Sequence, residues 1–468
     1  MYISKNFTAL PRSTPVEQGL STINLEELNR ALERTTASVR GYILVRHGKV
    51  IAEKYRSPYT DADKVWVYSV SKSFTSTAVG MAVDEGLLSL DDKVISFFPG
   101  HLPEAVSDNL SKMRVRDLLS MTSGHAFDTL DWLVKSDNPD WISLFLALPV
   151  ELEPGSRFVY NSGASFMLSA IVQAVTGVNL LDYLTPRLFE PLGYGDIDWD
   201  INFKGIATGG WGLSIGMEDL AKLGLLYLNR GMWGGKRILS EKWIDEATRS
   251  HIDNSEQNSW IDWKQGYGFQ FWRCQNNGFR ADGAAGQLCV VMPDQDAVFC
   301  VLSETNDLQE IIDCLWSTAF KGFGNTISEM EEQISGKSCT LEPTADAYKC
   351  ASFTFADSLL EFALTDSEGT EHKIRAGRGR WMDCETHMTL GFKSLVRFFE
   401  QASKPRKISA HFRWIGQNEL SIEWVYRDTP HRDVLICKWD GEYVSMLCPK
   451  GEVSQNLGAV DVALRGRM

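Results

Sequence analysis

Residues 65–86 read VWVYSVSKSFTSTAVGMAVDEG and contain the only Ser-x-x-Lys pattern of the chain, at Ser69 and Lys72. The residues before Ser69 predict an extended segment, whereas the apolar residues after it recur every three or four positions and predict an amphipathic helix. Residues three apart on a helix share one face, and its first turn favours developing negative charge. This pattern is typical of a serine nucleophile with a built-in base. The simpler alternative is a helix cap followed by a surface lysine.

Two further motifs favour the nucleophile. Tyr160-Asn161-Ser162-Gly163 precedes an apolar helical pattern, which would place a phenol and short polar side chains at the mouth of a cleft. Residues 281–287, ADGAAGQ, lead into a predicted strand. Their small size lets backbone N–H groups come close to a bound carbonyl.

These three motifs, in this order, resemble those of the serine β-lactamase and penicillin-binding-protein superfamily. The closest resemblance is to its branch of β-lactamase-like esterases and 6-aminohexanoate-dimer hydrolases. It extends over residues 15–320 and includes the segments 88–98, 116–125, 209–213 and 226–236. The resemblance implies an α+β fold, in which an antiparallel sheet is flanked by helices and carries a helical insertion.

The resemblance also implies roles for individual residues. Ser69 would be the nucleophile, and Lys72, neutral or sharing a proton with Tyr160, would help to deprotonate it. Tyr160 would then pass the proton to the leaving group. The backbone N–H groups of Ser69 and of Ala284 or Ala285 would hold the oxyanion.

Five more residues are candidates for the substrate-binding site: Asn161, Ser162, Asp282, Gly283 and His125. Relatives that act on β-lactams have Asn at the third position of the Tyr motif, where this chain has Ser162. They also carry a cation at the position that aligns with Asp282. We therefore expect repulsion of anionic substrates and weak or no β-lactamase activity. His125 either lines the cleft or is a structural imidazole.

Gly212-Leu213-Ser214-Ile215-Gly216 is a competing motif, because it matches the Gly-x-Ser-x-Gly nucleophile pattern of α/β-hydrolases. That pattern requires a strand before the serine and a helix after it. The preceding residues 205–211 are rich in glycine and not typical of a strand. We therefore expect Ser214 to lie in a loop at a helix entrance.

The hydrophobic patterns predict how the chain is organised. Residues 41–46 and 49–55 predict a hairpin, and residues 266–272, 286–292 and 297–302 predict strands, followed by a helix over 308–320. The predicted hydrolase domain therefore spans residues 1–322, with a linker at 323–345. Short alternating strands over 346–468 predict a C-terminal antiparallel β barrel or sandwich domain.

Composition limits the remaining options. A chain of 468 residues predicts two or three domains, and its net charge of −14 argues against binding to nucleic acid. Nine cysteines without a Cys-x-x-Cys pair suit a reducing compartment, and no apolar stretch predicts a signal peptide or a membrane span. We expect a cytoplasmic protein without a metal or cofactor, whose oligomeric state stays open.

Together these patterns predict a serine hydrolase that acts through an acyl-enzyme on a small ester or amide. Within the enzymes, a D-aminopeptidase or a β-lactamase stays open as an alternative. A catalytically silent binding protein that keeps the fold is the alternative from another class.

Overall fold

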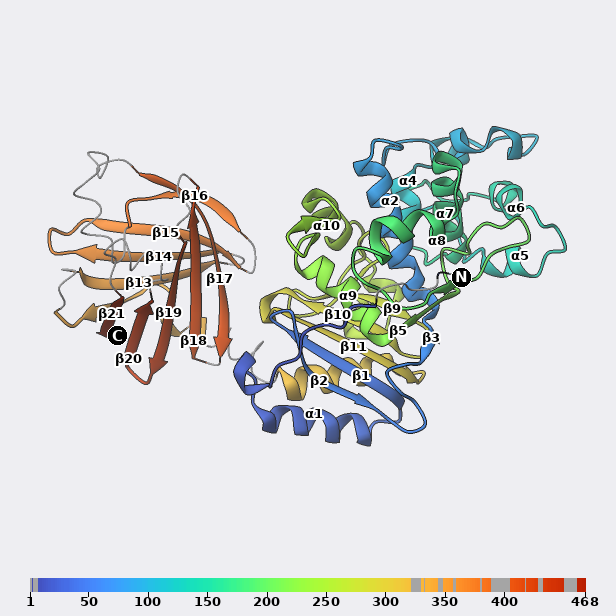
Figure 1. Cartoon of the computed structure of the whole chain (residues 1–468). Helices are drawn as coiled ribbons and strands as arrows, with labels where there is room; N and C mark the ends of the chain where they lie inside the picture. The colour runs from blue at the N-terminus through green and yellow to red at the C-terminus, as the bar shows by residue number, and fades with distance from the viewer. Residues whose placement is uncertain are drawn as a thin grey trace. The chain divides into compact units, whose positions relative to one another are not determined.

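The computed structural model describes residues 2, 7–320, 330–331, 333–343, 348–356, 359–378, 381–388, 405–416, 418–427, 432–449 and 461–468. Contacts divide the chain into two compact units, Met1–Ala319 and Phe320–Met468. Each unit has its own hydrophobic core. The two units are therefore described one at a time (Figure 1).

A six-stranded antiparallel sheet forms the centre of the first unit, in the order β2-β1-β11-β10-β9-β8. β1, from the start of the chain, lies beside β11, so that Val45 pairs with Val298. The predicted hairpin of β1 and β2 is confirmed. The strands are β1 (Ser38–Arg46), β2 (Lys49–Tyr55), β8 (Trp272–Arg273), β9 (Phe279–Gly283), β10 (Gln287–Met292) and β11 (Ala297–Glu304).

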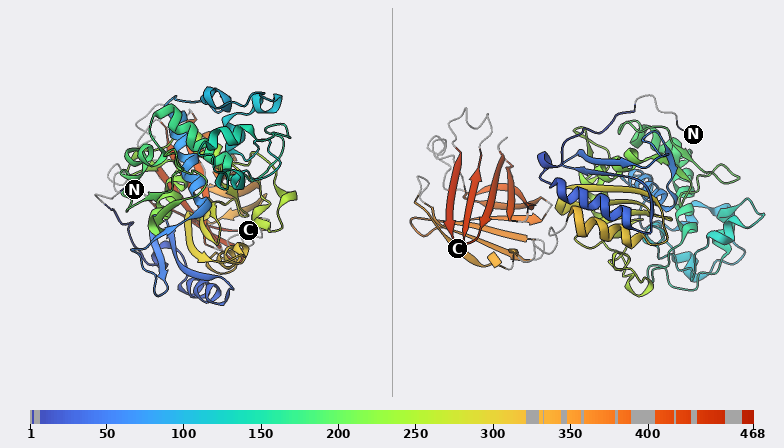
Figure 2. Two further views of the ribbon diagram at one scale, coloured as in Figure 1. Left: turned by 90° about the vertical axis from the view of Figure 1, so that its right-hand side faces the viewer. Right: turned by 90° about the horizontal axis from the view of Figure 1, so that it is seen from below.

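Helices cover both faces of this sheet. On one face, α1 (Thr22–Arg34) lies beside α11 (Leu308–Cys314), as the right-hand view of Figure 2 shows. The Tyr42 hydroxyl of β1 donates a hydrogen bond of 2.8 Å to the Asn29 side chain of α1. On the other face, α9 (Met217–Leu228) comes so close that a Cβ on Gly224 would lie 2.5 Å from Val298. Gly224 therefore permits the contact between α9 and β11.

The expected helical insertion lies between β2 and β8 and includes a small sheet in the order β3-β5-β4. Within the described residues no single helix is long and apolar enough to cross a membrane. One pair of helices, Ser162–Thr176 and Leu180–Phe189, bent by 67° relative to each other, meets the criteria of length and composition for a broken span, and these criteria alone. The strands of the insertion are β3 (Lys64–Trp66), β4 (Asp198–Trp199), β5 (Leu213–Gly216), β6 (Met232–Trp233) and β7 (Lys236–Arg237). Its helices, besides α9, are α2 (Ser71–Asp84), α3 (Asp108–Lys112), α4 (Val115–Leu119), α5 (Leu130–Val134), α6 (Trp141–Ala147), α7 (Ser162–Thr176), α8 (Leu180–Leu184) and α10 (Glu241–Thr248).

The strand predicted over residues 266–272 is wrong for all but its last residue, Trp272. A Cβ on Gly268 would lie 2.2 Å from the Ala247 carbonyl oxygen, and Gln270 has a φ of 63°. The positive φ of Gln270 does not fit a regular strand. This irregular segment instead packs against the end of α10 and buries Gln270, whose backbone N–H donates to the Leu119 carbonyl at 3.0 Å.

The second unit is an antiparallel sheet that closes on itself, because β15 also pairs in parallel with β17. Of the two predicted alternatives, barrel and sandwich, the barrel is therefore the observed form. Part of the expected linker 323–345 lies outside the described residues, but its residues 337–341 form β12, which pairs with β13 and β21. The strands are β12 (Lys337–Leu341), β13 (Tyr348–Ala356), β14 (Leu359–Asp366), β15 (Glu371–Arg378), β16 (Met382–Thr386), β17 (Arg406–Gly416), β18 (Glu419–Tyr426), β19 (Arg432–Asp440), β20 (Tyr443–Cys448) and β21 (Val462–Arg467).

Candidate active site

Ser69 lies in a single 3-10 turn, Tyr68–Val70, that leads into α2. Tyr68 has a φ of 47°, a left-handed conformation that is unfavourable for a residue with a side chain. The surrounding chain holds this turn in place, because the Val67 N–H donates to the Leu213 carbonyl of β5 at 2.9 Å. Ser69 is thereby left partly exposed, whereas the helix behind it is buried.

Lys72 is buried one turn further along, and its amine reaches the serine. The Nζ atom donates hydrogen bonds to Ser69 Oγ at 2.9 Å, to Ser162 Oγ at 3.2 Å and to the Gly210 carbonyl oxygen at 2.8 Å. All three acceptors are uncharged. The predicted meeting of the hydroxyl and the amine is therefore present in the structure.

This environment changes the acidity of the amine. Burial lowers the pKa of Lys72 to about 7, although the charges of Asp128 and Asp282 oppose the fall. Desolvation disfavours the charged form of a lysine, and among the described residues no carboxylate hydrogen-bonds directly to Lys72 to offset it. A large fraction of Lys72 is therefore neutral near pH 7, as a general base requires.

Tyr160 approaches the same pair from the segment before α7. Lys72 Nζ lies 4.8 Å from the centre of the Tyr160 ring, and the ring stacks on Trp272 at 5.7 Å with an interplanar angle of 24°. Burial raises the pKa of the Tyr160 phenol well above its usual value, and its hydrogen bond with Ser69 opposes the rise. The phenol is therefore protonated at neutral pH and can donate a proton or a hydrogen bond.

Ser162 belongs to this cluster through a residue that the sequence did not single out, Asp128. The Ser162 backbone N–H donates to Asp128 Oδ1 at 2.8 Å, and its hydroxyl donates to Asp128 Oδ2 at 3.2 Å. Asp128 therefore holds the side chain that accepts from Lys72. No spacing pattern marks Asp128, because it acts from a loop distant in the sequence.

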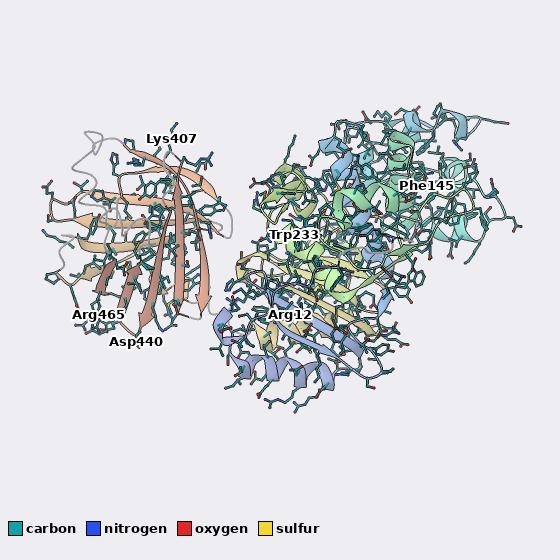
Figure 3. All side chains as sticks on the ribbon, viewed as in Figure 1. Arg12, Phe145, Trp233, Lys407, Asp440 and Arg465 are labelled. Atoms are coloured by element: carbon teal, nitrogen blue, oxygen red, sulfur yellow. The ribbon has the colours of Figure 1, made fainter. Side chains whose placement is uncertain are left out.

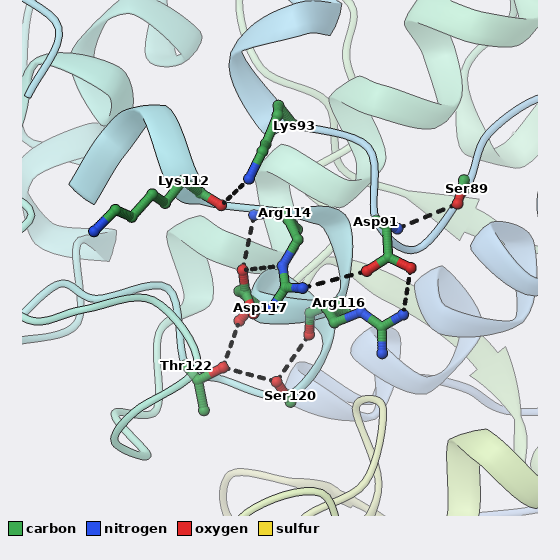
Figure 4. A network of polar contacts seen from close by, with 9 residues as sticks. All are labelled: Ser89, Asp91, Lys93, Lys112, Arg114, Arg116, Asp117, Ser120 and Thr122. Carbon is green, nitrogen blue, oxygen red and sulfur yellow. Dashed lines mark hydrogen bonds and ion pairs between the residues drawn. The ribbon is translucent and has the colours of Figure 1, made fainter. Parts of the chain in front are cut away.

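A polar network braces the segment that leads to Asp128 (Figure 4). The Asp117 carboxylate accepts from the Arg114 backbone N–H at 2.8 Å, and the Thr122 N–H donates to the Asp117 carbonyl at 2.8 Å. The hydroxyls of Ser120 and Thr122 share a hydrogen bond of 2.8 Å. These contacts fix the chain from the end of α4 to the start of the loop.

Asn161 is placed differently from the expectation that it binds substrate. It is fully buried at the N-terminus of α7. Its side-chain oxygen accepts from the N–H groups of Gly163 at 3.0 Å and Ala164 at 3.3 Å, and from the Thr129 hydroxyl at 2.8 Å. Asn161 therefore caps the helix and cannot contact a substrate in this conformation.

His125 has the structural role rather than a place in the cleft wall. The imidazole is fully buried, and its Nδ1 lies 3.0 Å from Ser123 Oγ. Its ring centre lies 4.6 Å from that of Phe145 on α6, which is labelled in Figure 3. Burial lowers the pKa of His125 to about 4, so the ring is neutral at physiological pH.

The end of β9 packs directly on the turn that carries Ser69. A Cβ on Gly283 would lie 2.3 Å from the Val67 carbonyl oxygen, so no larger residue fits there without a shift. Ala284 and Ala285 follow in the turn to β10, and Ala285 has a φ of 60°. The structure therefore brings the two candidate oxyanion donors to the same side of the molecule as Ser69.

Asp282 is paired with a residue that the sequence did not single out, Arg280. Arg280 Nε donates to Asp282 Oδ2 at 3.0 Å, and the guanidinium is fully buried, 3.8 Å from the Trp263 ring centre. Alternation along β9 places both side chains on one face. The ion pair offsets the Asp282 charge, so the repulsion of anionic substrates is weaker than expected from Asp282 alone.

Gly209 and Gly210 bring their backbone carbonyl groups close to the side chains of α2, one of which is Lys72. A Cβ on Gly210 would lie 2.9 Å from the Ser162 carbonyl oxygen, and Gly209 has a φ of 67°. The Gly210 carbonyl reaches Lys72, while the Gly209 carbonyl accepts from the Thr75 hydroxyl at 2.7 Å. Side chains at either position would prevent this approach.

Other sites for chemistry are not supported in the described residues. The expectation that Ser214 lies in a loop is wrong, because Ser214 belongs to β5, which leads directly into α9. Ser214 is nevertheless paired on both sides, opposite Trp66 of β3 and Asp198 of β4, and does not lie at a sharp turn between strand and helix. Within the described part of the chain, no three His, Cys, Asp or Glu side chains gather in a way that could hold a metal ion.

Comparison with known proteins places the chain in a family. A model of the Beta-lactamase family matches residues 29–313. The protein belongs to the Beta-lactamase family. As a member of this family, it is similar to the 6-aminohexanoate-dimer hydrolase of Paenarthrobacter ureafaciens, with 25% identity over 65% of this chain and 82% of that protein. It is also similar to the lovastatin esterase of Penicillium rubens, with 26% identity over 30% of this chain and 41% of that protein.

Solved structures agree on the fold of this Beta-lactamase family member. EstCE1, a hydrolase with promiscuous acyltransferase activity, superposes with a TM-score of 0.52 at 18% identity, over 64% of this chain and all (100%) of that one. A penicillin-binding-protein homologue from Caulobacter crescentus gives a TM-score of 0.52 at 15% identity, over 64% of this chain and 98% of that one. These likenesses show the fold.

Proposed function

We propose that the protein is a serine hydrolase that forms an acyl-enzyme with a small ester or amide. The observation that carries this proposal is the 2.9 Å contact between Ser69 Oγ and a buried amine whose pKa is lowered to about 7. A neutral amine at this position is the base that a serine nucleophile needs.

The mechanism follows from the placement of the three side chains. Neutral Lys72 accepts the Ser69 proton while Ser69 Oγ attacks the substrate carbonyl, and backbone N–H groups of Ser69 and of Ala284 or Ala285 stabilise the oxyanion. Tyr160, which is protonated, donates to the leaving group as the carbonyl re-forms, and it recovers a proton from Lys72. Water then hydrolyses the acyl-enzyme by the reverse proton path.

A fluorophosphonate probe tests this proposal. We expect one probe per chain, attached to the peptide that contains Ser69, together with hydrolysis of short-chain p-nitrophenyl esters. If the probe does not react and no ester is hydrolysed, the catalytically silent binding protein becomes the better account. Ester hydrolysis is chemically the easier reaction, so amide and D-amino-acid peptide substrates must be compared with esters under the same conditions.

Conversion of Tyr160 to phenylalanine is expected to lower kcat by ~10²–10⁴, because the variant cannot pass a proton to the leaving group. The ring stack on Trp272 does not involve the hydroxyl, so the fold should be retained. Steady-state kinetics with a p-nitrophenyl ester measures this loss. Tyr59→Phe, at an exposed site, is the matched control. An unchanged kcat in Tyr160→Phe would remove Tyr160 from the mechanism.

The pH dependence of kcat/KM should report the Lys72 amine. Because the neutral amine is the base, kcat/KM should decrease as the pH falls through about 7. Asp128 and Asp282 are the charged groups that raise this pKa, so Asp282→Asn should move the decrease to lower pH. Asp61→Asn, which removes a carboxylate that is not among the causes of the Lys72 shift, should leave the profile in place. A profile that stays near pH 7 in Asp282→Asn contradicts this account.

We expect nitrocefin to be hydrolysed slowly or not at all. Although Arg280 offsets the charge of Asp282, Arg280 is fully buried, and β9 therefore presents no exposed cation to a β-lactam carboxylate. The measurement is the initial rate of nitrocefin hydrolysis beside that of a p-nitrophenyl ester. A nitrocefin rate comparable to the ester rate would favour the β-lactamase alternative.

A further inference from the structure

A cavity of about 250 Å³ lies beside the nucleophile turn. Tyr68, the residue before Ser69, and Ala285, in the turn after β9, both line it. Both residues have positive φ angles, 47° and 60°, which a residue with a side chain adopts at a cost. Such outliers cluster at functional sites, and this cavity adjoins both the residue before Ser69 and the turn that carries the candidate oxyanion donors.

One wall of this cavity is aromatic, whereas Gln287 and Ser303 contribute polar side chains to the rest of the lining. Trp66 and Tyr68 line it with their rings 4.5 Å apart, and 40% of Trp66 is exposed although it is a large apolar residue. Contact with a substrate chain would remove that indole surface from water.

The cavity is also lined by a positively charged side chain. Arg40 of β1 lines the cavity together with Glu304 of β11, and 32% of the Arg40 side chain is exposed. The nearest atoms of the two charged groups are 3.7 Å apart, beyond a good hydrogen bond, and 72% of the Glu304 side chain is exposed to solvent. The Arg40 guanidinium also lies over the Tyr59 ring, 5.1 Å from its centre, but within the described residues it donates no side-chain hydrogen bond. Its planar set of donors is therefore available for a second carboxylate.

We propose that this cavity binds the acyl chain of the substrate and that Arg40 binds a carboxylate at the far end of that chain. The inference rests on the hydrolase activity proposed above and adds a substrate class to it, esters or amides of dicarboxylic acids. The net charge of −14 disfavours anionic ligands in general, so a preference for such a substrate has to come from a local cation.

Two esters with the same chain test the inference: mono-(4-nitrophenyl) adipate and its methyl ester, which lacks the charge. The readout is the ratio of kcat/KM for the acid to kcat/KM for the methyl ester. We expect a ratio of about 10 in the wild type, from a charged hydrogen bond. Arg40→Met should bring the ratio close to one, and Glu304→Gln should raise it because a competing carboxylate is removed. Arg30→Met on α1, an exposed arginine, is the matched control and should keep the wild-type ratio.

The outcomes separate this inference from the proposed function. Hydrolysis of both esters with a wild-type ratio of one or less, or an unchanged ratio in Arg40→Met, would overturn the subsite and leave the hydrolase proposal standing. If neither ester is hydrolysed and no probe labels Ser69, the proposed function fails and the subsite fails with it.

Discussion

The Ser69→Ala variant is expected to lose ester hydrolysis by a factor of about 10⁴ or more and to lose fluorophosphonate labelling completely. Ser69 is the nucleophile of the proposed mechanism, and Ser162, the other hydroxyl that bonds to Lys72, is buried and donates to Asp128. The change removes one hydroxyl from a partly exposed side chain, so the fold should be unaffected. Initial rates with p-nitrophenyl butyrate and mass spectrometry of the labelled protein measure both effects.

Ser214→Ala is the matched control for this variant, because Ser214 belongs to the competing Gly-x-Ser-x-Gly motif. Its position within β5 predicts wild-type rates and wild-type labelling. The opposite result, in which Ser214→Ala is inactive and Ser69→Ala is active, would exchange the two assignments.

Replacement of Lys72 by alanine is expected to lower kcat by ~10²–10⁴, the usual contribution of a positioned acid–base group. The amine contacts Ser69 at 2.9 Å, whereas Tyr160, the other side chain that bonds to this hydroxyl among the described residues, is protonated at neutral pH and is therefore no base. Because alanine also leaves a cavity at a fully buried position, Lys72→Met should be measured beside it.

Pre-steady-state kinetics sharpen this test. Both Lys72 variants should acylate slowly in single-turnover experiments with a p-nitrophenyl ester. Their unfolding midpoints should be measured as well, because a lowered midpoint would show that the variant has lost stability and not only the catalytic base. Lys112→Ala, at an exposed position on α3, is the control. Wild-type acylation in Lys72→Met would show that another group is the base.

Local spacing explains why the central pair was predictable. Ser69 and Lys72 are three residues apart at a helix start, and this separation suffices to bring their side chains together. Tyr160 required the resemblance to a known family, since nothing local connects it to Ser69. The role of Asn161 as a helix cap could also be predicted, because an Asn directly before an apolar helix is a common N-cap. This local pattern predicts the position of the Asn161 side chain better than the catalytic motif does.

The missed residues act through contacts that no local pattern encodes. Gly210 accepts from Lys72 across 138 positions, and Asp128 accepts from Ser162 across 34. Arg280 is different, because it lies two residues before Asp282 on one strand and could have been found by alternation. From Asp282 alone the sequence predicted repulsion of anionic substrates, and the buried Arg280 that pairs with Asp282 weakens that repulsion.

In the fold, regular elements were predicted and special backbone conformations were not. The small and aromatic residues of 266–272 alternate as in a strand, but the positive φ of Gln270 breaks the pattern. In the second unit the alternating strands were predicted, whereas the parallel pairing of β15 with β17 that closes the barrel was not. Periodicity reveals which face of a strand is buried, but not which partner it meets.

The pairing of β1 with β11 has a consequence for synthesis of the protein on the ribosome. β1 is made early, but its partner, which includes Val298, emerges roughly 250 residues later. During that interval the apolar strand has only β2 beside it, and a lone hairpin is marginally stable in water. A nascent chain stalled before residue 297 should therefore expose β1 to chaperones and to aggregation, and release of the stall should end that exposure.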